Sequence, residues 1–278
     1  MAAVALGSTP LVSLVYTRPP SIDFFVQYRP ILTTFFDNFN RADAGPPNGL
    51  GPNWYKRIPT GGSATIESGK AHPTNVGDDS VFGYINDMTS NNFYVEALCS
   101  AQCAPYPNEL GFGAWSALNL RHKAPWRNEI ELVLEPNSNI SMKEHSTTLP
   151  NVEYCIAEVE GYVSEQVYRL RLEVEGNVAT GFIDNVQRMQ GPTINGDGRG
   201  VGLGWLIPQA GTPNKCTTED WQCGVIPPWQ MWNDPVSSIT GAVITGLVPG
   251  TRYQFRAAPV GVVEGQVSWS DVVIATAT

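Results

Sequence analysis

The sequence predicts an all-β protein in which antiparallel sheets pack face to face. Two observations support this fold class. The 278 residues include 27 Gly, 22 Pro and 10% aromatic residues but only 15% charged ones, a composition typical of many short strands joined by turns. In addition, residues 167–186 have the pattern of a complete β-hairpin. Because a hairpin alone is marginal in water, its apolar face requires a second layer, and a second sheet would supply it.

Residues 1–32 alternate short apolar runs with prolines, such as Pro10 and Pro30. Proline lacks the amide donor that a sheet ladder needs, so we expect edge strands or an extended N-terminal arm here. Such a segment stays ordered only if it pairs with the C-terminal part of the chain or with another subunit. The first cation, Arg18, follows the apolar run, which does not fit a secretory signal peptide.

Strand-length segments separated by turn residues follow between residues 35 and 207. Besides the hairpin, they are Asn91–Leu98, Gly111–Arg121, Glu129–Glu135, Val152–Val159 and Val201–Ile207. Apolar and acidic residues alternate in the third of them. Its inward-facing residues are predicted to be Ile130, Leu132 and Leu134, and its outward-facing ones Glu129, Glu131, Val133 and Glu135.

The hairpin of residues 167–186 has a register that the sequence defines. Gly176 and Asn177 fit a two-residue turn, which requires positive φ, and this places Glu175 opposite Val178. One face is then apolar and is expected to be buried. The other face, where Arg169 lies opposite Asp184 and Glu173 opposite Thr180, is expected to be in solvent. The apolar residues are Tyr168, Leu170, Leu172, Val174, Ala179, Gly181 and Ile183.

Residues 208–235 show no clear period and many turn formers, so we expect a long loop or linker there. With it, the chain divides into an N-terminal arm (1–32), a sandwich domain (33–207), the linker (208–235) and a small β module (236–278).

Charge and composition exclude several classes of partner. The net charge of -9 and the pI near 4.8 argue against nucleic acid, whose binding depends on Lys and Arg. No apolar run approaches the ~20 residues of a membrane-spanning helix. The three histidines are not spaced with cysteines as a zinc site requires, and we expect no metal and no cofactor. Of the five cysteines, Cys99 with Cys103, or Cys216 with Cys223, could close small loops; whether the second pair is bridged stays open.

A set of motifs in a fixed order provides a family resemblance. The pattern F-x-D-x-F-x-R, ending at Arg41, is followed by L-G-x-N-W at Leu50–Trp54, by the hairpin, and by GVGLGW at Gly200–Trp205. This order resembles the concanavalin A-like (laminin G-like) jelly roll of minor tail proteins from tailed bacteriophages of actinobacteria. The resemblance covers about residues 35–207. It implies a jelly-roll sandwich and a structural role in a virion.

The C-terminal residues carry a second resemblance. The pattern Leu247-x-Pro249-x-Thr251-x-Tyr253 is similar to the tyrosine corner of fibronectin type III modules, which implies that the Tyr253 hydroxyl bonds to upstream backbone. Only the closing strands of such a module are found in residues 236–278. Either a neighbouring subunit completes it, or the N-terminal strands of the same chain do.

The acidic strand requires a test for catalysis, because β-glucanases of a related jelly-roll family carry an E-x-D-x-x-E motif. Glu129 and Glu131 match two positions loosely, but Leu134 replaces the last Glu and Glu135 comes one residue late. Retaining hydrolysis needs a nucleophile and an acid. The incomplete motif predicts that the protein is not an enzyme. The glutamates are expected to form a solvated face, with a binding surface as the alternative.

The eight tryptophans raise the alternative of sugar binding, although core or interface anchors are the simpler explanation. Trp54, Trp205 and Trp269 lie in strand motifs and are expected in the core. Of those in or near loops (Trp115, Trp126, Trp221, Trp229 and Trp232), Trp115 and Trp126, with Arg121 between them, are the candidates to face a glycan.

Together, these observations predict a structural minor tail protein, made in the host cytoplasm and assembled into the virion tail. It is expected near the tail tip, in contact with other tail subunits as a homo- or hetero-oligomer, and to contribute to attachment to host-surface glycan. The alternatives are a carbohydrate-binding or glycan-cleaving protein directed at the cell envelope, or a secreted bacterial lectin. Fold resemblance does not decide between them.

Overall fold

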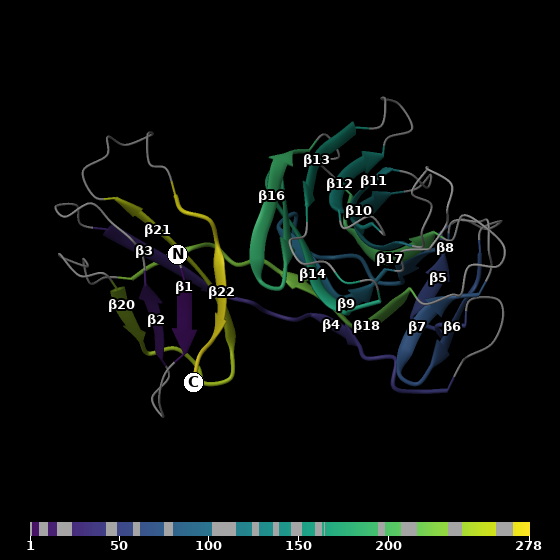
Figure 1. The fold of residues 1–278 in the computed structure, drawn as a ribbon, viewed down its shortest axis with the longest axis horizontal. Helices are drawn as coiled ribbons and strands as arrows, with labels where there is room; N and C mark the ends of the chain where they lie inside the picture. Colours follow the sequence, from purple (N-terminus) through teal and green to yellow (C-terminus); the bar gives the residue numbers. More distant parts are fainter. Residues whose placement is uncertain are drawn as a thin grey trace. The chain divides into compact units, whose positions relative to one another are not determined.

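The computed structural model describes most of the chain as two compact units. The described residues are 2–5, 11–15, 24–42, 49–57, 62–74, 80–101, 115–123, 128–135, 139–145, 152–158, 163, 165–193, 198–206, 216–232, 241–259 and 269–278. The larger unit comprises residues 33–184 and 188–225, and the smaller unit comprises 1–32, 185–187 and 226–278. All regular structure in the described residues is β, as predicted, and no helix among them could span a membrane (Figure 1).

The larger unit contains a seven-stranded antiparallel sheet. In spatial order, its strands are β13 (Val152–Glu158), β12 (Asn139–His145), β11 (Asn128–Leu134), β10 (Trp115–Lys123), β17 (Gly200–Leu206), β8 (Ser80–Tyr84) and β5 (Trp54–Lys56).

The second sheet of the larger unit contains the predicted hairpin. In spatial order, its strands are β16 (Val186–Pro192), β15 (Val178–Ile183), β14 (Tyr168–Glu175), β9 (Phe93–Ser100), β18 (Thr217–Val225), β7 (Lys70–Pro73) and β6 (Ala64–Glu67), with β4 (Phe35–Asp37) also paired to β18. The first residues of β16 belong to the smaller unit, in which Val186 pairs with Val273.

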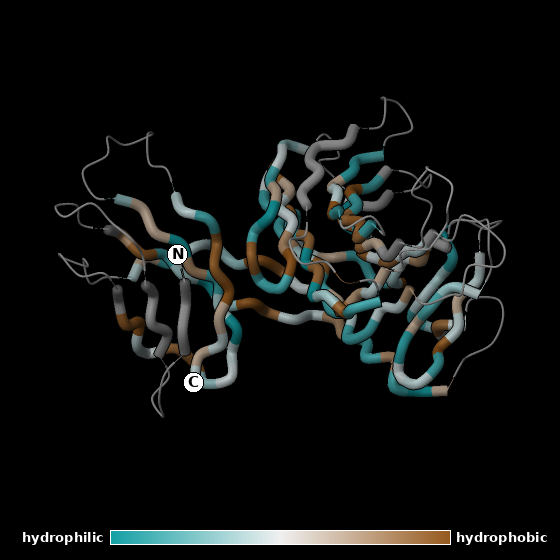
Figure 2. Tube along the Cα trace, viewed as in Figure 1, coloured by the Kyte–Doolittle hydropathy of each residue, from teal (hydrophilic) through white to brown (hydrophobic). Residues whose placement is uncertain are grey.

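The two sheets bury their apolar faces against each other, and hydrophobic and polar residues alternate along the strands (Figure 2). A Cβ on Gly181 of β15 would lie 2.8 Å from Leu132 Cδ1 of β11, so the sheets are in close contact there. The hairpin register is confirmed: Glu175 pairs with Val178 and Glu173 with Thr180. Its predicted apolar face lies in this core. The jelly-roll sandwich predicted from the sequence is therefore the fold of the larger unit.

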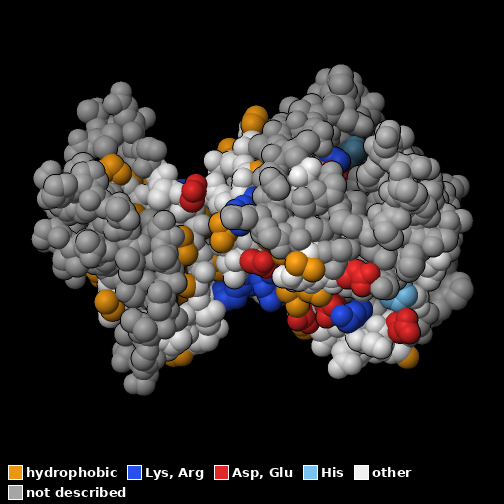
Figure 3. All heavy atoms as spheres, in the orientation of Figure 1, with side chains coloured by type: hydrophobic (Ala, Val, Ile, Leu, Met, Phe, Trp, Pro, Cys, Tyr) orange, Lys and Arg blue, Asp and Glu red, His pale blue; other side chains and the backbone are white. Residues whose placement is uncertain are grey.

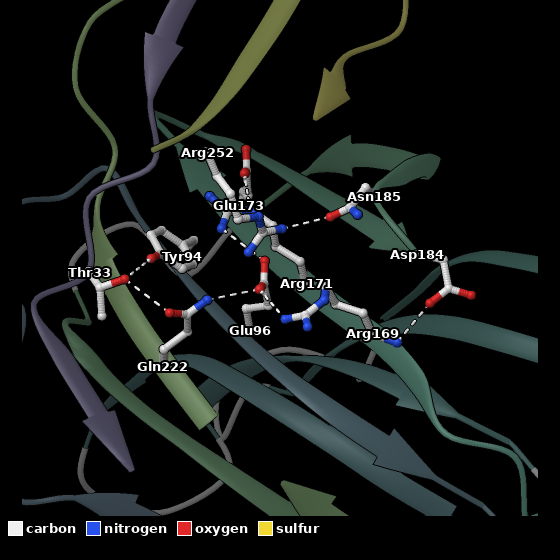
Figure 4. Close-up of polar contacts among 10 residues, drawn as sticks. All are labelled: Thr33, Tyr94, Glu96, Arg169, Arg171, Glu173, Asp184, Asn185, Gln222 and Arg252. Carbon is white, nitrogen blue, oxygen red and sulfur yellow. Dashed lines mark hydrogen bonds and ion pairs between the residues drawn. The ribbon is translucent and has the colours of Figure 1, made fainter. Parts of the chain in front are cut away.

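The second face of the hairpin differs from the prediction of a solvated surface. Arg171 is only 2% exposed, and its guanidinium binds both Glu96, at 3.2 Å, and Glu173, at 2.5 Å (Figure 4). It also lies 3.6 Å from the ring centre of Tyr94. Arg169 binds the other oxygen of Glu96 at 2.8 Å. This face is polar but largely buried, and its charges are paired with one another and with Glu96 of the neighbouring strand β9.

The expectation of a long loop over 208–235 is wrong for its central part. Residues 217–225 form β18, which pairs with β9 in the middle of the second sheet. Trp221, expected near a loop, is fully buried, and its ring centre lies 4.8 Å from that of Trp54. The compact unit accordingly extends to Val225 rather than to residue 207.

The F-x-D-x-F-x-R motif has a structural explanation. Asp37 accepts hydrogen bonds from Phe39 N, from both Nη atoms of Arg41 and from Trp54 Nε1, at 2.5 to 2.8 Å. The Arg41 guanidinium also donates to Leu50 O. The hydrogen bond to Asp37 raises the pKa of Arg41. These contacts join the residues of the first motif to those of L-G-x-N-W.

The smaller unit is built from both ends of the chain. One sheet has the order β1 (Ala2–Ala5), β2 (Leu11–Val15) and β20 (Gly241–Thr245); the other has the order β19 (Gln230–Met231), β3 (Phe24–Pro30), β21 (Arg252–Pro259) and β22 (Val273–Thr276). Residues 24–30 pair with 253–259, and 11–15 pair with 241–245. The N-terminal strands thus complete the C-terminal ones within one chain.

The Tyr253 hydroxyl accepts a hydrogen bond from Val248 N at 3.0 Å, the contact expected of a tyrosine corner.

The expectation that Trp269 lies in the core is wrong. It lies half-buried in a stack in which the Arg256 guanidinium is 4.5 Å from its ring centre and 4.1 Å from that of Trp229. Arg29 lies 4.0 Å from Trp229. Such cation–π stacks stabilise partly buried arginines.

The thiols of Cys99, Cys216 and Cys223 are buried, and none of the three forms a disulfide. Cys216 and Cys223 are not bridged, because strand β18 separates them by much more than the ~7 Å between Cα atoms that a disulfide allows. Burial raises the pKa of the Cys99 and Cys223 thiols to about 12, which makes both unreactive at neutral pH. The thiol of Cys103 lies outside the described residues.

Candidate functional site

The acidic strand β11 carries a cluster of charged side chains on the face of the seven-stranded sheet opposite the core. Glu129 and Glu131 project from alternate positions, while Ile130 and Leu132, which follow them, are buried in the core. Asn119 of the neighbouring strand β10 joins the two carboxylates, because its Nδ2 lies 3.2 Å from Glu129 Oε2 and 2.9 Å from Glu131 Oε1. The alternation predicted from the sequence thus places both glutamates in one site.

Glu129 forms an ion pair with Arg57, which directly follows β5 at the far edge of the same sheet. Both side chains are buried. Burial lowers the pKa of Arg57 to about 10, although the nearby Tyr55 and Glu131 oppose this shift. The guanidinium therefore stays charged at neutral pH and neutralises the carboxylate of Glu129.

Glu131 is held in its ionised form. Its Oε2 lies 2.9 Å from His145 Nε2 of β12, and its other oxygen accepts the hydrogen bond from Asn119. Burial alone would raise the pKa of Glu131, but the contacts with His145, Arg57 and Asn119 outweigh burial, and the pKa is lowered.

The expectation that these glutamates form a solvated face is wrong. Glu129 is buried and the Glu131 side chain is 17% exposed. Val133, also predicted to point outward, is buried as well. Glu135, just after β11, accepts hydrogen bonds from Lys143 Nζ at 2.9 Å and from Ser141 Oγ at 2.7 Å. Every acidic residue of this segment therefore has a polar partner on a neighbouring strand.

Tyr55 of β5 adds an aromatic ring beside the charged cluster. A Cβ on Gly83 of β8 would lie 2.6 to 2.8 Å from Cζ, the hydroxyl and Cε1 of Tyr55, so the ring lies over a position that has no side chain. Tyr55 is 41% exposed. Burial of its inner part raises the pKa of the phenol, so Tyr55 remains protonated at neutral pH.

The other predicted site residues are placed as follows. Arg121 is 1% exposed and donates to Gly176 O at 2.5 Å and to Asn91 O at 3.1 Å. A buried guanidinium that binds two carbonyl groups is unavailable to a sugar, so Arg121 supports the hairpin turn instead. Trp115 begins β10, and its side chain lies outside the described part of the structure. Trp126 lies outside the described residues.

The sequence interpretation missed four members of the site: Tyr55, Arg57, Asn119 and His145. The alternation of side chains along a strand gives a signal for Tyr55 and Arg57. Trp54 is a core residue, so residues 55 and 57 lie on the opposite side of the strand. Their proximity to β11 could not be read from the sequence, because β8, β17 and β10 separate β5 from β11 in the sheet.

The cluster differs from the glucanase motif in its carboxylates. Retaining or inverting hydrolysis requires one carboxyl group that is protonated, with a raised pKa. Glu131 has a lowered pKa, and Glu129 is neutralised by Arg57. Leu134, at the third position of the glucanase motif, is buried in the core. The described residues of the cluster therefore supply hydrogen-bond acceptors, and a buried leucine takes the place of the third carboxylate.

Away from this cluster, a hollow of about 310 Å³ lies on the sheet of the larger unit that contains the hairpin. It is lined mainly by Glu67, Lys70, His72, Ser100, Glu165 and Thr217. Its polar groups pair with one another or with close neighbours, as in the 2.9 Å contact between Ser100 Oγ and Thr217 Oγ1. Among the described residues that line this hollow there is no Phe, Tyr or Trp. In the view of Figure 3, the described acidic and basic side chains of the larger unit are interspersed rather than grouped by sign.

Comparisons with known proteins identify similar folds. No protein-family model and no curated protein sequence matches the chain. Among solved structures, a Bacillus subtilis protein of unknown function with a galectin-like fold is similar with a TM-score of 0.51 and 10% identity, over 72% of this chain and 98% of that one. An endo-acting O-glycanase of the human gut microbiota has a TM-score of 0.50 and 10% identity, over 70% of this chain and all (100%) of that one.

A third similar structure is the CBM2 module of the evolved Dit of Lactobacillus casei BL23 phage J-1, with a TM-score of 0.47 and 10% identity, over 74% of this chain and 97% of that one. At such identities the likeness concerns the fold alone. The chain therefore has a jelly-roll fold of the kind seen in galectin-like proteins, and its function has to be argued from its own residues.

Proposed function

We propose that the protein is a structural component of a bacteriophage tail that binds glycan on the host surface without cleaving it. The observation that carries this proposal is the pairing of the two carboxylates: Glu129 lies against Arg57, Glu131 lies against His145 with a lowered pKa, and Leu134 stands where a third carboxylate would be. Ionised carboxylates, an amide and an imidazole on one sheet face are suitable partners for sugar hydroxyl groups.

The virion location is supported by the order of motifs in residues 35–207, which resembles that of minor tail proteins. We propose partners among the other tail subunits, and a position near the tail tip where a glycan-binding face would meet the cell. Mass spectrometry of purified virions, compared with the lysate from which they were isolated, checks the location. A protein that stays in the soluble fraction and is absent from virions would instead fit the alternative of a free lectin.

Glycan binding without cleavage can be tested on the purified full-length protein. We expect no release of reducing ends from β-glucan or from host cell-wall polysaccharide, because the catalytic motif is incomplete at Leu134. A glycan array is expected to show binding. Turnover that Glu129→Gln or Glu131→Gln abolishes would contradict the proposal, and absence of binding on the array would favour a purely structural role.

Trp115 at the start of β10 remains a candidate for glycan contact on the ground of its sequence context. Trp126 remains a candidate from its sequence context alone. Glycan binding that survives replacement of both tryptophans by Ala would show that neither contributes to the site.

A further inference from the structure

We infer that Tyr55 is a stacking platform for a neutral pyranose ring, with the polar cluster of Glu131, His145 and Asn119 beside it to bind the ring hydroxyls. This inference rests on the proposed glycan binding and names the subsite and the class of sugar. The first observation is exposure. Among the described aromatic side chains of the larger unit, only Tyr55 and Phe36 are exposed, and the others are buried or half-buried.

The second observation is the support beneath the ring. Gly83 has no side chain, and the phenol end of Tyr55 occupies the space that a Cβ would need. Gly83 pairs with Tyr55 on one side and with Gly202 of β17 on the other. The backbone of the sheet thus fixes one side of the ring, while 41% of the residue remains exposed. A fixed aromatic ring with an exposed part loses little conformational entropy when a ligand stacks on it.

The third observation is the chemistry next to the ring. Tyr55 is close enough to Arg57 for their charges to interact, and Arg57 in turn interacts with Glu131. Glu131 and His145 are both partly exposed. Asn119 donates through Nδ2 to two carboxylates, while its buried Oδ1 has no hydrogen-bond donor among the described residues. A ligand hydroxyl could satisfy such an acceptor.

The charges decide the class of sugar. Arg57 offsets Glu129, and His145 stands against Glu131, so the site has no unpaired cation among the described residues to attract a uronic acid. The oxygen atoms of Glu131 and Asn119 are acceptors, which suit hydroxyl donors. These features favour a neutral pyranose over an acidic one.

Affinity electrophoresis of the full-length protein tests this inference, in native gels that contain β-glucan, galactan or the acidic polygalacturonate. We expect retardation in a neutral polysaccharide, about tenfold weaker binding for Tyr55→Ala, and binding close to that of the native protein for Tyr55→Phe. Phe36→Ala removes the other exposed ring among the described aromatic side chains of the larger unit, and it is expected to leave binding unchanged.

Tyr55→Leu keeps an apolar side chain over Gly83 without a flat ring, so it separates stacking from folding if Tyr55→Ala is unstable. Unchanged retardation of Tyr55→Leu or Tyr55→Ala would overturn the platform while glycan binding stands. Retardation in polygalacturonate alone would overturn the assignment to a neutral sugar. A native protein that no gel or glycan array retains would refute the proposed function itself.

Discussion

At the scale of single residues, the chain uses carboxylates to join segments that are distant in sequence. Asp37 binds Arg41 and Trp54, and Glu96 binds Arg169, Arg171 and Gln222. A buried carboxylate is costly unless each oxygen has partners, and here the partners come from other strands. The same principle governs Glu129 and Glu131: Arg57 and Asn119 pair with Glu129, and the partners of Glu131 lower its pKa.

The lowered pKa of Glu131 predicts how stability depends on pH. The folded protein holds this carboxylate ionised below its usual pKa of 4.5, whereas the unfolded chain protonates it near that value. The stabilisation is therefore complete above pH 4.5 and is lost as the pH falls through the folded pKa. We expect Glu131→Gln to show a shallower loss of stability on acidification than the native protein.

Urea unfolding between pH 7 and pH 3, followed by the fluorescence of the buried Trp54 and Trp221, measures this difference. The slope against pH is compared rather than the stability at pH 7, because the substitution also removes contacts with His145 and Asn119. Glu175→Gln, at the exposed hairpin turn, is the control and should keep the native slope. Equal slopes for Glu131→Gln and the native protein would contradict the assignment.

The alternation of apolar and acidic residues predicts that Glu129 and Glu131 lie on one face of a strand. It does not predict whether that face is in contact with solvent. Solvation depends on Arg57, Asn119 and His145, which come from other strands. The sequence likewise shows the F-x-D-x-F-x-R pattern without showing that Trp54, 17 residues after Asp37, binds the same carboxylate. Local sequence patterns predict which residues share one face of a strand. The residues that cover this face come from strands distant in sequence, which these patterns do not reveal.

At the scale of elements, the hairpin was predictable because its turn and its apolar face specify one register. Gly176 has a φ of +57°, while Asn177 is not among the residues with positive φ, so only the first turn position needs glycine. The turn is also tied to the sandwich, because Asn92 accepts from Gly176 N and Arg121 donates to Gly176 O.

Gly176→Val is expected to destabilise the protein by about 1–2 kcal/mol, since a β-branched residue is strained at positive φ. No atom lies within 4 Å of the position of its Cβ, so the effect comes from the backbone and not from a clash. Thermal unfolding measures it. Glu175→Val places the same side chain on the neighbouring residue, where φ is not positive, and should leave the melting temperature nearly unchanged. Equal melting temperatures for the two variants would place the turn elsewhere.

Strand β18 was not predictable, for a physical reason. A bulge interrupts its pairing with β9 between Glu219 and Gln222, and Asp220 has a φ of +47°. The bulge shifts the alternation, so that Thr218, Trp221 and Cys223 are all buried although they do not follow a period of two. A central strand that a bulge interrupts has no regular alternation in the sequence.

At the scale of the whole molecule, the jelly roll is inserted into the smaller unit. The chain leaves after β3 and returns at β19, and these two strands pair directly, with Tyr28 opposite Gln230. The two ends of the insertion also lie together, since Phe35 pairs with Cys223 and Thr34 N donates to Cys223 O. The sequence showed the closing strands of a sandwich without its opening ones because about 190 residues lie between them.

This arrangement predicts that the smaller unit folds without the jelly roll. Its core includes Val26 from the N-terminal part and Ile244, Tyr253 and Phe255 from the C-terminal part. Because the ends of the insertion meet at paired strands, a short Gly/Ser linker should join residue 32 to residue 226 without strain. We expect this excised chain, and separately residues 33–225, to unfold cooperatively.

Hydrogen exchange distinguishes the outcomes for the excised chain. Residues 24–30 and 252–259 should be protected in it, because β3 and β21 pair along their length. Residues 226–278 alone are the control and should exchange fast, since they lack β1, β2 and β3 and expose the edges of β20 and β21. Fast exchange throughout the excised chain would mean that the smaller unit depends on the jelly roll or on a partner subunit. Protection in residues 226–278 alone would instead mean that the N-terminal strands are dispensable, and the insertion would then join two independent modules rather than interrupt one.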